Sequence, residues 1–120
     1  MAIDFRVEHR EPYSVVRADG EPTLAEFLDF VARLGRASMS WTHDRVLVDL
    51  RSVRTLKSAS EHQAVGEAVG RHLAHLRHIA SVVPADRMTR GSEKPARSAG
   101  VNLAVFTNER EAIDWLIAAT

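Results

Sequence analysis

The sequence predicts one α/β domain with a mixed β-sheet and helices packed against it. Strand and helix patterns alternate along most of the chain, which is typical of parallel strands joined by helical crossovers. The first two strands are separated by only a short turn, which favours an antiparallel hairpin. The length of 120 residues fits a single domain with one core, so residues 1–120 are assigned to one domain. The expected element order is β-β-α-β-α-β-(α)-β-α.

The N-terminal hairpin is predicted from a change in pattern at one turn. Residues 3–9 alternate apolar and polar side chains, which is the period of a half-buried strand. Glu11-Pro12 supplies a short turn, and residues 13–18 form the second strand. Asp19-Gly20-Glu21-Pro22 then has the composition of another turn.

The first helix begins at a recognisable capping pattern. Thr23 and Glu26 have the spacing of a capping box, in which each side chain accepts from the other residue's backbone N–H. We expect the helix to end at Gly35 or within residues 38–40. Its apolar residues recur at helical spacing and predict one buried face: Leu24, Phe27, Leu28, Val31 and Leu34.

The remainder of the chain predicts the parallel part of the sheet. Residues 46–50 form a short, nearly continuous apolar run, which indicates a strand covered on both faces. A second capping pattern, Ser58 with Glu61, opens the next helix. The elements that follow are a strand at 79–83, a loop or short helix at 85–100, a strand at 101–106, and a last helix capped by Thr107-Asn108.

Composition excludes several classes of protein. Sixteen basic and sixteen acidic residues cancel, so no net charge favours nucleic acid. The absence of cysteine excludes disulfides, thiolate nucleophiles and cysteine-based zinc sites. Apolar runs of about five residues are far shorter than the ~20 that a membrane span needs. The N-terminus lacks a signal-peptide pattern, and we expect a cytoplasmic protein.

Two stretches resemble a known family. One is Val46–Leu50 followed by Arg51–Ser60 and a helix; the other is Val105–Leu116, in which a strand leads into a Phe-Thr…Glu-Ala…Trp-Leu ending. Together with the element order, they resemble the STAS-like (SpoIIAA-like) family of small bacterial proteins. That family is related in fold to the STAS domains of anti-anti-sigma factors. The resemblance implies a STAS-like mixed sheet.

The resemblance also singles out Ser58. In anti-anti-sigma factors, the first serine of an Asp-Ser-Ser-Gly turn at the start of the second helix is phosphorylated by a partner kinase. Aligned from Asp49, that turn reads Lys57-Ser58-Ala59-Ser60 here. The resemblance therefore implies that Ser58 is a phosphoacceptor or a partner contact. From the residues alone, Ser58 is predicted to be a helix N-cap.

A cluster of basic residues suggests a binding rim. Segments 51–57 and 87–97 follow two strands that are expected to be parallel, so both should emerge at one edge of the sheet, near helix N-termini that favour anions. The alternative is that these are ordinary solvated surface charges. The candidate residues are Arg51, Arg54, Lys57, Arg87, Arg90, Lys94 and Arg97.

Two spaced motifs have weaker functional interpretations. His72, His75 and His78 have a spacing that can chelate a metal, but they are expected on a core face and at the start of a strand. We therefore expect no metal site and no cofactor. Gly66 and Gly70 favour close packing within the domain or, alternatively, a homodimer interface.

The hypothesis that follows is a non-enzymatic regulatory or protein-interaction module. It would bind a protein partner through the loop and helix start around residues 51–62, since no set of catalytic residues is recognisable. The alternative is a domain that binds a small anionic or lipid ligand, using the basic rim and an apolar cleft. The resemblance supports that alternative because the STAS-like group is similar in fold to CRAL-TRIO lipid-transfer domains.

Overall fold

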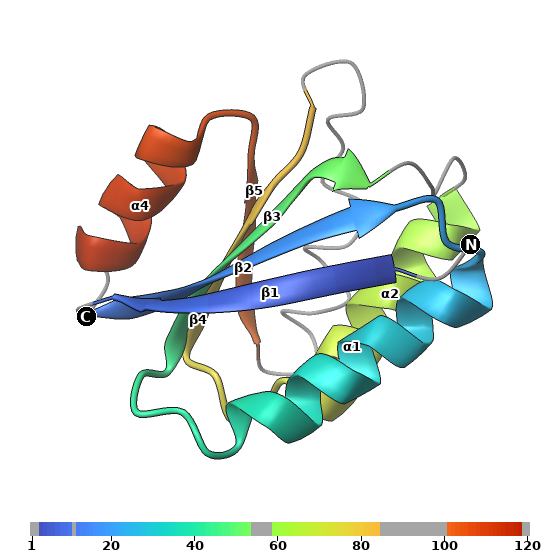
Figure 1. Ribbon diagram of the computed structural model, residues 1–120, viewed down its shortest axis with the longest axis horizontal. Coiled ribbons are helices and arrows are strands. Elements are labelled where there is room, and N and C mark those ends of the chain that lie inside the picture. Colours follow the sequence, from blue (N-terminus) through green and yellow to red (C-terminus); the bar gives the residue numbers. More distant parts are fainter. Residues whose placement is uncertain (1–2, 11, 54–58, 85–100, 119–120) are drawn as a thin grey trace.

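A computed structural model describes residues 3–10, 12–53, 59–84 and 101–118 (Figure 1). Every strand and helix predicted within these ranges is confirmed, with modest shifts at the ends. The predicted loop or helix at 85–100 lies outside the described residues. The elements are β1 (Ile3–Arg10), β2 (Tyr13–Gly20), α1 (Leu24–Ser38), β3 (Arg45–Val53), α2 (Ala59–His72), β4 (His78–Val82), β5 (Asn102–Phe106) and α4 (Glu109–Ala118).

The described strands form one mixed sheet in the order β1-β2-β3-β4-β5. β1 and β2 pair antiparallel, and the other neighbours pair parallel, which confirms the expected sheet. Asp49 of β3 pairs with Val82 of β4, and Val82 pairs with Phe106 of β5. The carboxyl ends of β4 and β5 therefore meet at one edge, beside the part of β3 that continues to Val53.

Helices cover both faces of the sheet (Figure 1). α1 and α2 lie together on one face, and α4 lies on the other. Alternate residues of β3 point to opposite faces of the sheet. Val46 and Val48 are buried with α1 and α2, whereas Leu47 is buried with Ala112 and Leu116 of α4. This explains why the β3 sequence is apolar on both faces and not alternating.

The capping box of α1 is confirmed. The Thr23 hydroxyl accepts from the Glu26 N–H at 3.2 Å, and the Glu26 carboxylate accepts from the Thr23 N–H at 2.9 Å. The helix continues through Gly35 and ends at Ser38, so the expected end at Gly35 is wrong and the alternative near 38–40 is confirmed.

Gly35 has a different purpose, which is close contact with the end of α2. A Cβ placed on Gly35 would lie 2.6 Å from the carbonyl oxygen of His72, well inside van der Waals contact. Only glycine allows the two helices to approach this closely. Gly66 and Gly70 of α2 are also buried within the single chain, which supports packing within the domain over the homodimer alternative. None of the described helices is long and apolar enough to cross a bilayer.

Candidate functional site

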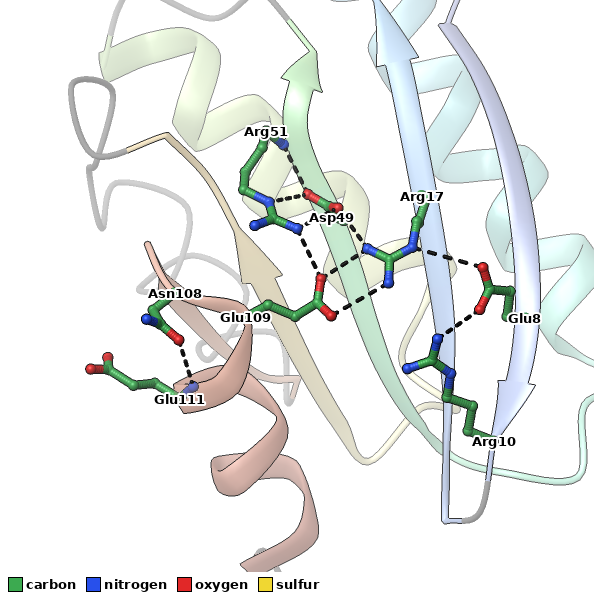
Figure 2. A network of polar contacts seen from close by, with 8 residues as sticks. All are labelled: Glu8, Arg10, Arg17, Asp49, Arg51, Asn108, Glu109 and Glu111. Atoms are coloured by element: carbon green, nitrogen blue, oxygen red, sulfur yellow. Dashed lines mark hydrogen bonds and ion pairs between the residues drawn. The ribbon is translucent and has the colours of Figure 1, made fainter.

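A network of charged side chains lies on the α4 face of the sheet, at the start of α4 (Figure 2). It joins Arg17 of β2, Asp49 and Arg51 of β3, and Glu109, the first residue of α4. Side chains alternate between the faces of a strand, so residues two positions after Val15 and Leu47 return to the α4 face. Val15 and Leu47 pack under α4, and the charged residues occupy the next positions on that face.

Asp49 and Arg51 form a two-pronged ion pair within β3. The Arg51 Nε donates to Asp49 Oδ1 at 2.9 Å, and its Nη2 donates to Oδ2 at 2.9 Å. The backbone N–H of Arg51 also donates to Asp49 Oδ1, at 3.1 Å. Two parallel N–H···O bonds fix the guanidinium plane as well as its distance.

Glu109 connects both arginines to α4. Its Oε1 accepts from Arg17 Nη1 and from Arg51 Nη2, each at 2.8 Å. Arg17 Nη1 also donates to Asp49 at 2.9 Å. Two guanidinium groups and two carboxylates therefore alternate in a closed arrangement whose charges cancel.

The network extends weakly across the hairpin. The Nε of Arg17 lies 3.8 Å from the Glu8 carboxylate, which in turn pairs with Arg10 at 2.8 Å. Both Glu8 and Arg10 are exposed, so solvent screens this extension more than it screens the centre.

Pairing determines the protonation of the central carboxylates. Burial acts to raise the pKa of Asp49, but hydrogen bonds from Arg51 and Arg17 outweigh it and lower that pKa below its ordinary value. The hydrogen bond from Arg17 likewise lowers the pKa of Glu109. Hydrogen bonds to Glu109 and to Asp49 raise the pKa values of Arg17 and Arg51, respectively. All four groups are therefore charged at neutral pH.

The start of α4 is positioned by its own cap. The Asn108 side-chain oxygen accepts from the Glu111 N–H at 3.2 Å, which confirms the predicted cap at Thr107-Asn108. A negative charge at the first helical residue, Glu109, is favourable because helix N-termini carry partial positive charge. The network and the cap together tie α4 to β2 and β3.

Of the predicted site residues, the structure describes only Arg51. Its guanidinium is engaged by Asp49 and Glu109, and its side chain is 43% exposed. The parallel pairing of β3 with β4, which the predicted rim requires, is confirmed. The other candidates lie outside the described residues: Ser58, Arg54, Lys57, Arg87, Arg90, Lys94 and Arg97.

Sequence reasoning missed Arg17, Asp49 and Glu109. One signal was available: Asp49 interrupts an otherwise apolar strand that is covered on both faces, and a carboxylate in such a place needs a cationic partner. Of its cationic partners, Arg51 lies two residues away on β3, but Arg17 belongs to β2, at a separation of 32 residues along the chain, which no local pattern reveals. Glu109, which accepts from both arginines, comes from α4.

A second feature lies at the opposite end of the sheet, where β3 and β4 begin. A surface depression of about 470 Å³ is lined by residues that include Ser38, Trp41, His43 and His75. The buried Ser38 hydroxyl donates to the Gly35 carbonyl at 3.1 Å, and it lies 2.7 Å from His75 Nε2. Ser38 therefore closes the end of α1 and links it to the segment that follows α2.

The three spaced histidines occupy separate environments. His72 is half-buried at the end of α2, His75 bonds to Ser38, and His78 is buried at the start of β4 against Trp115. Within the described ranges, no group of three or more His, Cys, Asp or Glu residues could hold a metal ion.

Solved structures similar to this chain share its fold. One is an uncharacterised DUF3478-family protein with a SpoIIAA-like fold from Shewanella loihica, with 18% identity, a TM-score of 0.53, and coverage of 96% of this chain and 94% of that chain. A second is an anti-sigma factor antagonist from Mycobacterium paratuberculosis, with 17% identity, a TM-score of 0.54, and coverage of 97% and 95%. A third is the anti-sigma factor antagonist SpoIIAA in its unphosphorylated form, with 18% identity, a TM-score of 0.55, and coverage of 97% and 100%.

At these identities, the structural likeness shows the fold and not the function. A comparison with curated protein sequences finds no match. The comparison with protein families is decisive for membership, because the SpoIIAA-like family matches residues 14–117, which is most of the chain. The expected family is thereby confirmed: the chain belongs to the SpoIIAA-like family.

Proposed function

We propose that this protein is a non-enzymatic regulatory module of the bacterial cytoplasm that binds a protein partner through the surface around residues 51–62. The observation that supports the proposal is the polar network, which ties the end of β3 to the start of α4. The described part of the proposed surface, at Arg51, is therefore held in place by ion pairs. A side chain that is already ordered loses less conformational entropy on binding.

The chemistry of the network supports a scaffold in preference to a catalytic site. General acid–base catalysis at neutral pH requires a group whose pKa lies near 7. Pairing moves the pKa values of Asp49 and Glu109 in the opposite direction, below their ordinary values. Both carboxylates are also engaged by arginines, so neither is available to exchange a proton with a substrate.

The names of the structural neighbours support a protein as the partner. Two of them are anti-sigma factor antagonists by name, and such proteins act by binding another protein. We extend protein binding to this chain, with Ser58 as a partner contact or phosphoacceptor. A phosphate on Ser58 would lie at a helix N-terminus and next in sequence to Lys57, both of which favour added negative charge.

The test is a comparison of matched serine variants at the two ends of the sheet. The tagged chain is expressed in its native host, captured proteins are identified, and the main partner is titrated against purified variants. Ser52→Arg adds a long charged side chain beside the proposed surface, whereas Ser40→Arg adds the same side chain at the opposite end; both serines are exposed. We expect Ser52→Arg to weaken the affinity at least about tenfold and Ser40→Arg to leave it unchanged. The reverse pattern would overturn the proposed surface.

The alternative proposal, an anionic or lipid ligand at the basic rim, is distinguished by native mass spectrometry of the protein as purified. A bound small molecule that is lost in a Lys57→Glu, Arg90→Glu double variant would favour the ligand-binding domain. An unligated mass combined with a captured protein favours the interaction module, and an added phosphate that disappears in Ser58→Ala identifies the phosphoacceptor.

A further inference from the structure

Strand β1 forms one edge of the sheet, and this edge has an unusual charge pattern. Among the described strands, β1 pairs only with β2, so half of its backbone groups face away from the sheet. Its side chains on the α4 face alternate in sign, and all of them are exposed: Asp4, Arg6, Glu8 and Arg10.

Two observations establish which backbone groups face outward. Arg10 pairs with Tyr13 across a two-residue turn, and the pair that closes such a turn is hydrogen-bonded, so the even-numbered residues of β1 face β2. Independently, the carbonyl of Ile3 accepts from Arg33 of α1 at 3.3 Å, so this odd-numbered residue faces outward. Phe5, Val7 and His9 therefore direct their backbone N–H and C=O groups away from β2, and no described strand pairs with them.

We propose that this edge pairs antiparallel with β1 of a second copy of the chain, about a two-fold axis at Val7. In that register, Val7 lies opposite its own copy, and Phe5 lies opposite His9. These odd-numbered pairs exchange the outward-facing backbone hydrogen bonds. The inference rests on β1 alone and does not depend on the function proposed above.

The charges select this register over its neighbours. With Val7 on the axis, Asp4 faces Arg10 and Arg6 faces Glu8, so every charged pair across the interface is attractive. The even-numbered pairs are the non-hydrogen-bonded ones, in which side chains lie closest. A shift that centres the axis on Arg6 places Arg6 against itself and Asp4 against Glu8, and a shift to Glu8 places Arg6 against Arg10. Both alternatives are repulsive.

The opposite face of the edge also fits a second copy. Phe5 and Val7 are only partly buried and pack at the margin of the main core, beside α1. In the two-fold pairing, the two Val7 side chains lie next to each other on this face. The pairing would join two five-stranded sheets into one continuous sheet, a closed symmetric arrangement in which the β1 edge of each copy is covered by the other.

The test is the sedimentation of charge variants over a wide range of protein concentration. We expect the unaltered chain to dimerise reversibly. Asp4→Arg places two like-charged pairs in the interface and should weaken the dimer about tenfold or more. The double variant Asp4→Arg, Arg10→Asp exchanges the two charges, restores attraction in the same register and should recover most of the affinity.

Two further variants separate edge pairing from other effects. Asp114→Arg makes the same charge change on the exposed face of α4 and should leave the dimer intact. Val7→Pro removes an outward-facing N–H without removing a bond to β2, and should abolish dimerisation while the circular dichroism of the fold is preserved. A chain that stays monomeric at every concentration overturns the proposal, as does a dimer that Asp4→Arg leaves unchanged.

Discussion

The two ends of the parallel strands β2 to β5 are stabilised by different interactions. Toward the carboxyl ends of the strands, Arg17, Asp49, Arg51 and Glu109 form a network of charges that cancel (Figure 2). At the amino ends, α1 and α2 meet at Gly35, and the hydrogen bond between Ser38 and His75 borders an open depression. The carboxyl end therefore holds the network of ion pairs, and the amino end holds the close contact between helices.

This difference predicts different responses to the same perturbation. Ion pairs that are partly exposed are screened by salt and lost in acid, whereas steric contact between helices is insensitive to both. Variants at the two ends should therefore change the free energy of unfolding by different amounts, and these changes should depend differently on salt and pH.

The largest effect is expected at the helix contact. Gly35→Ala places a methyl group 2.6 Å from the His72 carbonyl oxygen, which is backbone and cannot rotate away. Such overpacking costs about 1–3 kcal/mol, which exceeds the gain of up to about 1 kcal/mol from alanine's higher helix propensity. Urea denaturation should show a net loss of free energy of unfolding that is independent of salt. Arg36→Ala, on the exposed neighbouring position, is the control; a stabilised Gly35→Ala protein would contradict the close contact.

The second effect tests the charged end. Asp49→Asn keeps the size of the side chain but leaves Arg17 and Arg51 with one carboxylate between them. Because Asp49 is 13% exposed, the loss should exceed that of a surface pair, at about 1–2 kcal/mol, and should shrink as salt is added.

The same network should also make the free energy of unfolding depend on pH in the acidic range. The folded-state pKa values of Asp49 and Glu109 are lowered, so their stabilisation is fully present above the ordinary carboxyl pKa of about 4 and is lost as the pH falls below it. Asp49→Asn should make the unfolding free energy less dependent on pH in that range. Asp114→Asn, in an exposed pair with Arg110, should change little. Equal effects from both variants would count against the network.

The fold was predictable from sequence because its signals are local. The period of two in β1, the capping box at Thr23 and the apolar run of β3 are each readable within about ten residues. The β-β-α-β-α order then restricts the sheet topology to few arrangements.

The charged network was not predictable for the opposite reason. Arg17 meets Asp49 across a strand pair, so that contact depends on register. Glu109 meets Arg17 and Arg51 from α4, so those contacts depend on where α4 docks. The same dependence applies to Gly35, whose neighbour His72 belongs to another helix. Its sequence position near the end of α1 suggested a terminator, and only the contact between helices reveals its steric purpose.

The smallest expected effect is a loss of stability at mildly acidic pH, which arises from His78 at the amino end of the sheet. His78, at the amino end, is buried, and its Nδ1 has no hydrogen-bond partner among the described residues. Burial lowers the pKa of His78, and the nearby charges of Arg45 and Arg77 lower it further, while Asp44 opposes them. The folded state therefore favours the neutral imidazole, and protonation favours unfolding. Stability should decline, by less than about 1 kcal/mol, as the pH falls below the ordinary histidine pKa of about 6.5.

His78→Phe keeps an aromatic ring against Trp115, which contacts His78 edge-on at 5.6 Å between centroids, but removes the titrating group. The variant should be as stable as the original at neutral pH and should lose the decline below pH ~6.5, while the carboxylate-dependent decline below pH ~4 remains. Arg77→Ala should have a weaker effect in the same direction, because it removes one of the charges that disfavour protonation. If His78→Phe instead altered the decline below pH ~4, the two ends of the sheet would not be electrostatically independent. Measuring the free energy of unfolding of His78→Phe in both pH ranges therefore tests whether the two ends titrate independently.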